Sequence, residues 1–281
     1  MITRVPPINQ EQKKVRRLAP EETFGSSVAL YDSLAQVYDS LFDAPGHRNI
    51  YDTLAWEHVS RFISTTPAFI IDVGCGTGRW AAKWLAAGHR VIGIEQAPSM
   101  IEVLRSKNLG PQFELVASAM EDAVIESGCA DLVVAMGSAH YARNPALMLV
   151  KFAQWVKPGG MVCVYVDSLV ALVLELLRLQ KLSEAFACLE RGRGVWQQGG
   201  HRAHLHLFDR KTLEALFAKA GLHAISSRGL LVTASAWGRE GFSKAIADDA
   251  QAFLDLERQL SEFGELADAG KHLLVSGRRP L

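Results

Sequence analysis

The stretch FIIDVGCGTGRWAAKWLAAGHRVIGIE, residues 69–95, decides the fold. It opens with the apolar, β-branched run Phe69–Val73, which is typical of a strand buried on both faces of a parallel sheet. A helix must begin almost at once, because helix-forming residues run from Arg79 to Ala87. Between them lie glycines that allow a sharp turn and close approach of a ligand, namely Gly74, Gly76 and Gly78. Arg90–Glu95 is a second apolar run that ends in an acid, so the stretch predicts half of a nucleotide-binding fold.

The spacing of the glycines selects among nucleotide ligands. A dinucleotide-binding fingerprint has its third glycine where this chain has Arg79. The pattern here is D-x-G-x-G-x-G, with Asp72 two residues before the first glycine. It resembles motif I of the class I S-adenosylmethionine-dependent methyltransferases, in particular the small-molecule subgroup. An NAD-type domain and a fold that has lost its ligand stay open as alternatives.

This resemblance implies an α/β fold, a doubly wound, seven-stranded and mostly parallel sheet of Rossmann-like type, that binds S-adenosylmethionine. In the family, the acid that ends the second strand, here Glu95, takes the ribose hydroxyls of the cofactor. The loop at the adenine edge usually carries an aspartate where this chain has Ser118, whose hydroxyl makes a weaker bond. The residues expected to bind the cofactor are Tyr31, Asp72, Gly74, Cys75, Gly76, Gly78, Glu95, Gln96, Met100, Ser118, Ala119, Met120 and Met136.

The expected catalytic residues follow the fourth predicted strand, Asp131–Met136. The carboxyl end of such a strand is where an open parallel sheet places its ligands, and in the family this loop lies beside the transferable methyl group. His140 is expected to act as a base or an orienting group, because an imidazole can take a proton near neutral pH. Its neighbour Tyr141 is the second catalytic candidate. A histidine that is hydrogen-bonded only for structure is the alternative.

Two segments are expected to cover the site. Residues 1–24 are polar and proline-bearing, which favours a flexible leader, and residues 25–281 form the methyltransferase domain. Within it, residues 25–65 resemble the family's N-terminal helical lid, with two helices that meet near residues 44–46. By that resemblance Tyr31 or Tyr38 would face the methionine and sulfonium of the cofactor, although simple core packing is an equal alternative.

Residues 167–202 are expected to form an insert on the substrate side. An apolar helix over 169–189 is predicted, followed by a loose segment over 191–200. Packing of this helix on the sheet or on a second subunit is the alternative. The residues expected to bind the substrate are Tyr38, Trp196, Arg202 and His204. No metal is expected, because His204 and His206 on one strand face would make an incomplete set of ligands.

The remaining elements follow from apolar runs and end signals. Asp209 is expected to cap a helix that ends at Gly221, and a long helix is predicted over 245–266. The turn Lys157–Gly160 leads into the fifth strand in the family, and the last strand inserts antiparallel beside it. The later strands are predicted at Phe113–Val116, Met161–Val166, Leu222–Ala234 and Lys271–Arg278.

Composition is that of an ordinary globular chain. Its 281 residues are 49% hydrophobic, 21% charged and formally neutral overall, so nucleic acid is not an expected partner. The 4 cysteines form no C-x-x-C pair, which indicates a reducing compartment. No apolar run is long enough to span a bilayer, so we expect a cytoplasmic protein with no membrane contact. A homodimer stays open.

Together these features favour an S-adenosylmethionine-dependent methyltransferase of biosynthesis. It would move a methyl group to an O, N, S or C nucleophile of a small metabolite by in-line displacement. A tRNA wobble-uridine methyltransferase of the carboxymethyl type is the alternative, because the LERQL helix and the closing strand HLLVSGRRP also resemble those enzymes. A contiguous basic face would favour the alternative. A third class, a cofactor-binding protein without catalysis, would bind without turnover.

Overall fold

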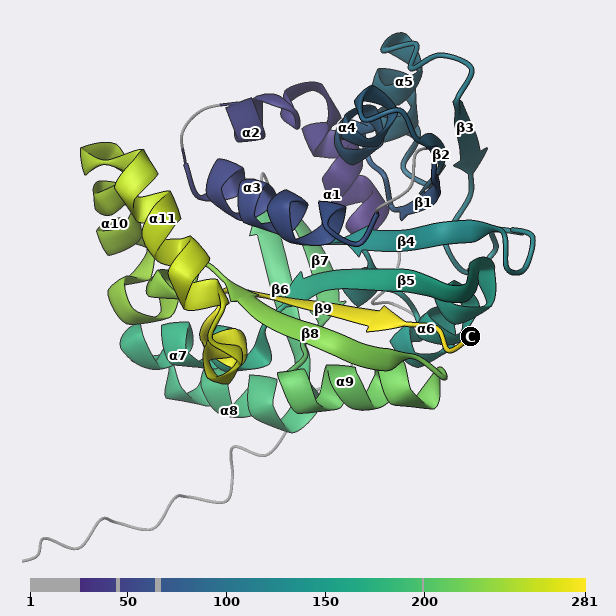
Figure 1. Cartoon of the computed structure of the whole chain (residues 1–281). Helices are drawn as coiled ribbons and strands as arrows, with labels where there is room; N and C mark the ends of the chain where they lie inside the picture. Colours follow the sequence, from purple (N-terminus) through teal and green to yellow (C-terminus); the bar gives the residue numbers. More distant parts are fainter. Residues whose placement is uncertain (1–25, 44–45, 64–66, 199) are drawn as a thin grey trace, which may run out of the picture.

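The fold is a seven-stranded sheet with helices on both faces (Figure 1). The computed structural model describes residues 26–43, 46–63, 67–198 and 200–281, so the expected leader over 1–24 lies outside it. Strand order is β3-β2-β1-β4-β5-β9-β8. The strands are β1 (Phe69–Val73), β2 (Arg90–Glu95), β3 (Phe113–Ala117), β4 (Ala130–Met136), β5 (Val156–Asp167), β8 (His223–Leu230) and β9 (His272–Arg278).

Only β9 runs against the other strands of this sheet. β1 to β5 pair in parallel, whereas β9 is antiparallel to both of its neighbours, β5 and β8. The predicted antiparallel insertion of the final strand next to the fifth is therefore confirmed, and so is the doubly wound α/β class. One detail differs, because β5 already begins at Val156 and includes Lys157–Gly160, with Gly159 at a φ of +78°.

Helices cover the two faces of the sheet and bury its core. One cluster of buried side chains contains Ile71 and Val73 of β1 together with residues of α6 (Pro145–Trp155) and α9 (Arg210–Lys219). A second cluster contains Ile70 of β1 together with residues of α3 (His47–Ser60), α4 (Arg79–Ala86), α10 (Thr233–Asp248) and α11 (Ala250–Ser261). Successive side chains of β1 thus point into the two cores in alternation, as expected for a strand buried on both sides. Asp209 caps α9 by accepting from the Thr212 amide, as predicted.

The N-terminal segment is more broken than predicted. Instead of one helix before residues 44–46 it forms α1 (Ser26–Leu34), a 3₁₀ turn (Ala35–Val37) and the short α2 (Ser40–Asp43). Residues 44–45, where the two helices were expected to meet, lie outside the described residues. α1 packs against α5 (Pro98–Ser106) and β7 (His201–His206).

The insert after β5 corrects two predictions. The single helix expected over 169–189 is two helices, α7 (Leu169–Arg178) and α8 (Leu182–Arg191), because Gln180 adopts a left-handed φ of +59°. The break lets Ala185 of α8 pack back on α7, which a continuous helix could not do. The loose segment expected over 191–200 is β6 (Arg193–Gln198), which forms an antiparallel hairpin with β7.

Two further predictions, both on the C-terminal part of the chain, were wrong. Leu231 has a φ of +57°, which turns the chain and ends β8 at Leu230 rather than at residue 234. The long helix expected over 245–266 is divided, because Asp249 accepts from the Ala252 amide and so begins α11 as its N-cap. A 3₁₀ segment, Gly264–Ala269, follows α11. In the described part of the chain, helices are too short or too polar to cross a membrane.

Candidate functional site

A cavity opens at the carboxyl ends of the parallel strands. It consists of two hollows with shared walls. We call one the Glu95 hollow, which is also lined by Ser118 and Met120, and the other the Asp167 hollow, which is also lined by His140 and His272. The residues that line both are Tyr31, Tyr38, Gly74, Gly76, Met136, Gly137 and Tyr141. One elongated ligand can therefore occupy both hollows.

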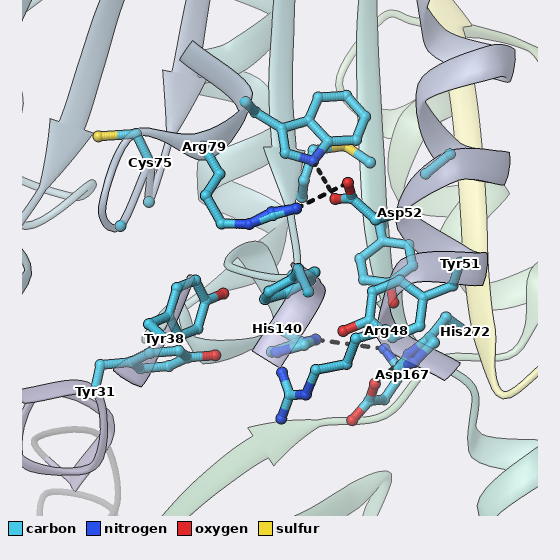
Figure 2. A pocket seen from close by; sticks show the side chains of 18 of the residues that line it. Tyr31, Tyr38, Arg48, Tyr51, Asp52, Cys75, Arg79, His140, Asp167 and His272 are labelled. Carbon is cyan, nitrogen blue, oxygen red and sulfur yellow. Dashed lines mark hydrogen bonds and ion pairs between the residues drawn. The ribbon is translucent and has the colours of Figure 1, made fainter. Parts of the chain in front are cut away.

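The glycine loop between β1 and α4 forms the floor between the two hollows. Gly74 has a φ of +67°, and a Cβ there would lie 2.4 Å from the Cβ of Ser138. Gly78, with a φ of +81°, does not line the cavity, and a Cβ there would lie 2.4 Å from Leu104. Cys75 lines the cavity through the loop backbone, since its sulfur turns away toward Gly93 (Figure 2). The loop therefore presents backbone rather than side chains.

The carboxylate of Glu95 is held in place by backbone amides. One oxygen accepts from Gly76 at 2.8 Å, and the other from Gln96 and Ala97, both at 2.8 Å. Burial raises the pKa of Glu95 above its ordinary value, and these three bonds oppose the rise. An ionised carboxylate offers about four acceptor sites, so it can still accept from hydroxyl groups in the hollow.

The far end of the Glu95 hollow is polar on one side and apolar on the other. Ser118 donates its hydroxyl to the carbonyl of Ala119 at 2.9 Å, which leaves its oxygen able to accept from an amine. Met120 supplies the apolar side, whereas Ala119 does not line the hollow. Met100 is also absent from the lining, because it is fully buried between α1 and α5.

Aromatic rings cover the cavity. The ring of Tyr31 lies 5.7 Å from that of Tyr141, 5.6 Å from Trp196 and 6.1 Å from Tyr38, measured between centroids. Three separate segments, α1, the turn after β4 and β6, thus meet over the site. Burial raises the pKa of Tyr31, so its phenol stays neutral at physiological pH.

An ion-pair cluster ties α3 to α4. Asp52 accepts from Arg79 at 2.9 Å (Figure 2). It also accepts from the indole nitrogen of Trp80 at 2.8 Å and from Lys83 at 2.6 Å. The Arg79 guanidinium also lies over the ring of Phe42, 3.6 Å from its centroid. α3 is therefore fixed beside the glycine loop.

The Asp167 hollow gathers titratable groups at the end of β5. The backbone amide of Asp167 donates to Nδ1 of His140 at 3.4 Å, and the Asp167 carboxylate lies 2.7 Å from Nδ1 of His272. Arg48 also projects into the hollow (Figure 2) and, among the described residues, has no carboxylate within 4.0 Å. Burial lowers the pKa of His140 to about 4, so its ring is neutral at pH 7.

A third, outer hollow of about 620 Å³ adjoins the Asp167 hollow. Residues of α7 and of the β6–β7 hairpin line it on one side, and residues of α10 line it on the other. Its apolar lining includes Leu172, Val195, Leu205, Leu207 and Phe242, and it shares His47, Arg48, Asp167, Trp196 and Lys271 with the Asp167 hollow. It offers room for a second molecule beside an elongated ligand.

Most of the residues expected at the site come together, but two expected substrate contacts do not. Arg202 is exposed and His204 half-buried on β7, and neither lines a hollow. In the part of the chain that the structure describes, no cluster of three histidine, cysteine or acidic side chains could hold a metal. Sequence reasoning missed Arg48, Asp52 and the Asp167–His272 pair. The only signal for the pair is its place at strand ends.

Comparison with known proteins agrees with this geometry. Residues 70–160 match the family model of the methyltransferase domain. A ubiquinone biosynthesis O-methyltransferase of Xanthomonas axonopodis pv. citri is 28% identical over 135 residues, 46% of this chain and 56% of the relative. One from Xylella fastidiosa is 30% identical over 107 residues, 37% of this chain and 44% of the relative. The chain thus spans about half the length of the curated relatives it matches.

Solved structures share the fold at low sequence identity. An S-adenosylmethionine-dependent methyltransferase from Mesorhizobium loti has a TM-score of 0.55 at 15% identity and covers 82% of this chain and 100% of its own. The 1,6-didemethyltoxoflavin N1-methyltransferase of Burkholderia thailandensis, solved with S-adenosylhomocysteine, has a TM-score of 0.55 at 17% identity, over 94% of this chain and 92% of its own. The resemblance to motif I is confirmed: this chain carries a methyltransferase domain, built on the class I S-adenosylmethionine-dependent methyltransferase fold.

Proposed function

We propose that this protein transfers a methyl group from S-adenosylmethionine to a small-molecule acceptor. The observation that carries the proposal is the amide-anchored Glu95 carboxylate beside a glycine loop, in a cavity that continues into a second, aromatic-walled hollow. The names of the matched relatives, which are O-methyltransferases, favour a hydroxyl as the acceptor. N, S and C nucleophiles stay within the proposal.

The residues fit the cofactor at each of its charged and polar ends. Glu95 would accept from the ribose hydroxyls, and Ser118 from the adenine amine. Asp72 has a buried Oδ2 with no partner in the described residues, so it is suited to a cationic α-amino group. Arg48 lines the Asp167 hollow and has no carboxylate partner among the described residues, so it is suited to the α-carboxylate. These four residues would thus bind the amino group and the carboxylate of the methionine part, and the ribose and the adenine of the adenosine part.

When bound, S-adenosylmethionine supplies a methyl group on a positively charged sulfur. Transfer of the methyl group releases a neutral sulfide, which is a good leaving group. The chain would then act mainly by placing an acceptor in line and by excluding water. The rings of Tyr31, Tyr38 and Tyr141 would surround the methyl group, because neutral aromatic rings favour a cation such as the sulfonium. Trp196 lines both the outer hollow and the Asp167 hollow, so the body of the acceptor would lie in the outer hollow and its reacting atom would reach into the Asp167 hollow.

The test is methyl transfer from isotopically labelled S-adenosylmethionine. Purified full-length protein would be offered a panel of phenols, catechols, hydroxy acids and amines, and bulk tRNA in a parallel reaction. The proposal predicts label in a small molecule. Label in tRNA alone would favour the wobble-uridine alternative, against which the formal net charge of zero weighs. Cofactor binding without label in any acceptor would favour the third alternative, a cofactor-binding protein without catalysis.

A further inference from the structure

His272 occupies an unusual position in the Asp167 hollow. It opens β9 and pairs across the ladder with Asp167, the last residue of β5. Nδ1 of His272 lies 2.7 Å from the carboxylate of Asp167. An ionised carboxylate can only accept, so Nδ1 must carry the ring proton and Nε2 keeps its lone pair. Nε2 is buried and has no hydrogen-bond partner among the described residues.

Neighbouring rings fix the orientation of this imidazole. The ring centroid of Tyr51, on α3, lies 4.8 Å from that of His272 (Figure 2). The ring centroid of Tyr165, on β5, lies 4.7 Å from that of His272. Both tyrosines and His272 line the hollow. The His272 ring is thus held by two neighbouring rings at the start of a rigid strand, in the wall of the Asp167 hollow.

His140 has the opposite arrangement. Its Nδ1 accepts the backbone N–H of Asp167, so the proton of the neutral ring must lie on Nε2. Nε2 of His140 is also buried without a partner in the described part of the chain. His140 can therefore donate a hydrogen bond to an acceptor oxygen, whereas His272 can take a proton from one.

We propose that His272 is the general base that deprotonates a hydroxyl acceptor, with Asp167 as its positioning residue and His140 as a hydrogen-bond donor to the acceptor oxygen. This inference rests on the proposed methyl transfer. As the acceptor oxygen bonds to the methyl carbon, the carbon–sulfur bond breaks and its electron pair stays on sulfur. The hydroxyl proton passes to Nε2 of His272. The resulting imidazolium is stabilised by the Asp167 carboxylate and returns the proton to solvent after the neutral products leave.

The charges around His272 suit a base that is neutral at rest. Burial lowers its pKa, the Asp167 carboxylate raises it, and Lys271 and Arg48 lower it again, with a net lowering below the ordinary value. For Asp167, burial raises the pKa, but the His272 hydrogen bond and nearby cationic or titratable groups lower it overall, so the carboxylate stays ionised. The other titratable groups that face His272 are His47, His140, Tyr51 and Tyr165.

The first test reads the tautomer without any turnover. The full chain would be prepared with ¹⁵N-labelled histidine, and the signals of its 9 histidines compared with those of His272→Gln to assign residue 272. At pH 7.5, with and without S-adenosylhomocysteine, we expect His272 as a neutral ring with its proton on Nδ1. Asp167→Asn should abolish this preference. A proton on Nε2, or a doubly protonated ring at pH 7.5, would overturn the proposal.

The second test reads catalysis. With a phenolic acceptor found by the labelled-methyl screen, His272→Gln should lower kcat about 100-fold or more and leave the Kd for S-adenosylmethionine within about threefold. The fall in rate at acidic pH, which reports protonation of the base, should also disappear in His272→Gln. His223→Gln, an exposed position on β8, is the matched control and should keep full activity. A His272→Gln variant with near-normal kcat would refute the role.

Failure of the two proposals would look different. If the protein neither binds S-adenosylmethionine nor labels any acceptor, the proposed function fails, whatever the histidine spectra show. If it methylates a hydroxyl acceptor with undiminished kcat after His272→Gln, the function stands and the base assignment alone falls.

Discussion

Replacing Asp52 with alanine should destabilise the protein by about 3–5 kcal/mol, because it leaves several donors without an acceptor. The indole N–H of Trp80 is buried and loses its bond to Asp52, at a cost of about 1–3 kcal/mol. Arg79 has a side chain only 17% exposed and loses an ion pair to a carboxylate that is 10% exposed, at a similar cost. Lys83 is 35% exposed, so solvent screens its share, which adds less than about 1 kcal/mol.

The assay is urea unfolding, supported by thermal melting. With an unfolding entropy of roughly 2 cal/mol/K per residue, the expected loss lowers Tm by about 5–9 °C for a chain of this length. The control is Asp248→Ala, which removes an exposed pair with Lys244 and should change stability by less than about 0.5 kcal/mol. A loss below about 1 kcal/mol for Asp52→Ala would contradict the role of this cluster in fixing α3.

Three further predictions concern Glu95, Asp72 and Met100. Glu95→Gln should weaken S-adenosylmethionine binding by about 1–3 kcal/mol, read by calorimetry, and an unchanged Kd would remove the ribose assignment. Burial and the nearby Glu95 raise the pKa of Asp72 to about 7, so the ligand-free wild type should lose stability as pH rises from about 4 to 7. Asp72→Asn should therefore have the higher urea midpoint at pH 8, with the difference shrinking toward pH 4; parallel curves would argue against the raised pKa. Met100→Ala should cost about 2–4 kcal/mol of stability and leave cofactor affinity within threefold, whereas a large affinity loss would show that Met100 contributes to cofactor binding after all.

The glycine loop and its flanking elements could be predicted because their signals are local. Apolar β-branched runs, closely spaced glycines and an acid at a strand end lie within residues 69–95. Asp209 was predictable for the same reason, since an N-cap acts within three residues of itself.

The insert and the C-terminal helices could not be predicted from periodicity. The helix break at Gln180 depends on a residue type without strong turn preference, and its benefit comes from packing between α7 and α8. An aspartate such as Asp249 often marks the start of a helix, but here it lies inside a continuous helical pattern of apolar residues. The pattern alone favoured one long helix.

The contacts that define the Asp167 hollow are long-range. Asp167 and His272 are 105 residues apart, and Asp52 and Arg79 are 27 apart. No spacing rule joins such positions, because the join depends on the register of β9 against β5 and on where α3 crosses the loop. The place of His140 in the hollow could be predicted because it follows a strand, but the tautomer of its ring is set by the Asp167 amide, which the sequence does not reveal.

Isothermal calorimetry with S-adenosylmethionine and S-adenosylhomocysteine tests the central claim most directly. The geometry predicts saturable binding of both at one site per chain, weakened in Glu95→Gln and unchanged in His223→Gln. Absence of binding by both ligands to folded wild-type protein would contradict the assignment of the glycine loop and Glu95 to this cofactor.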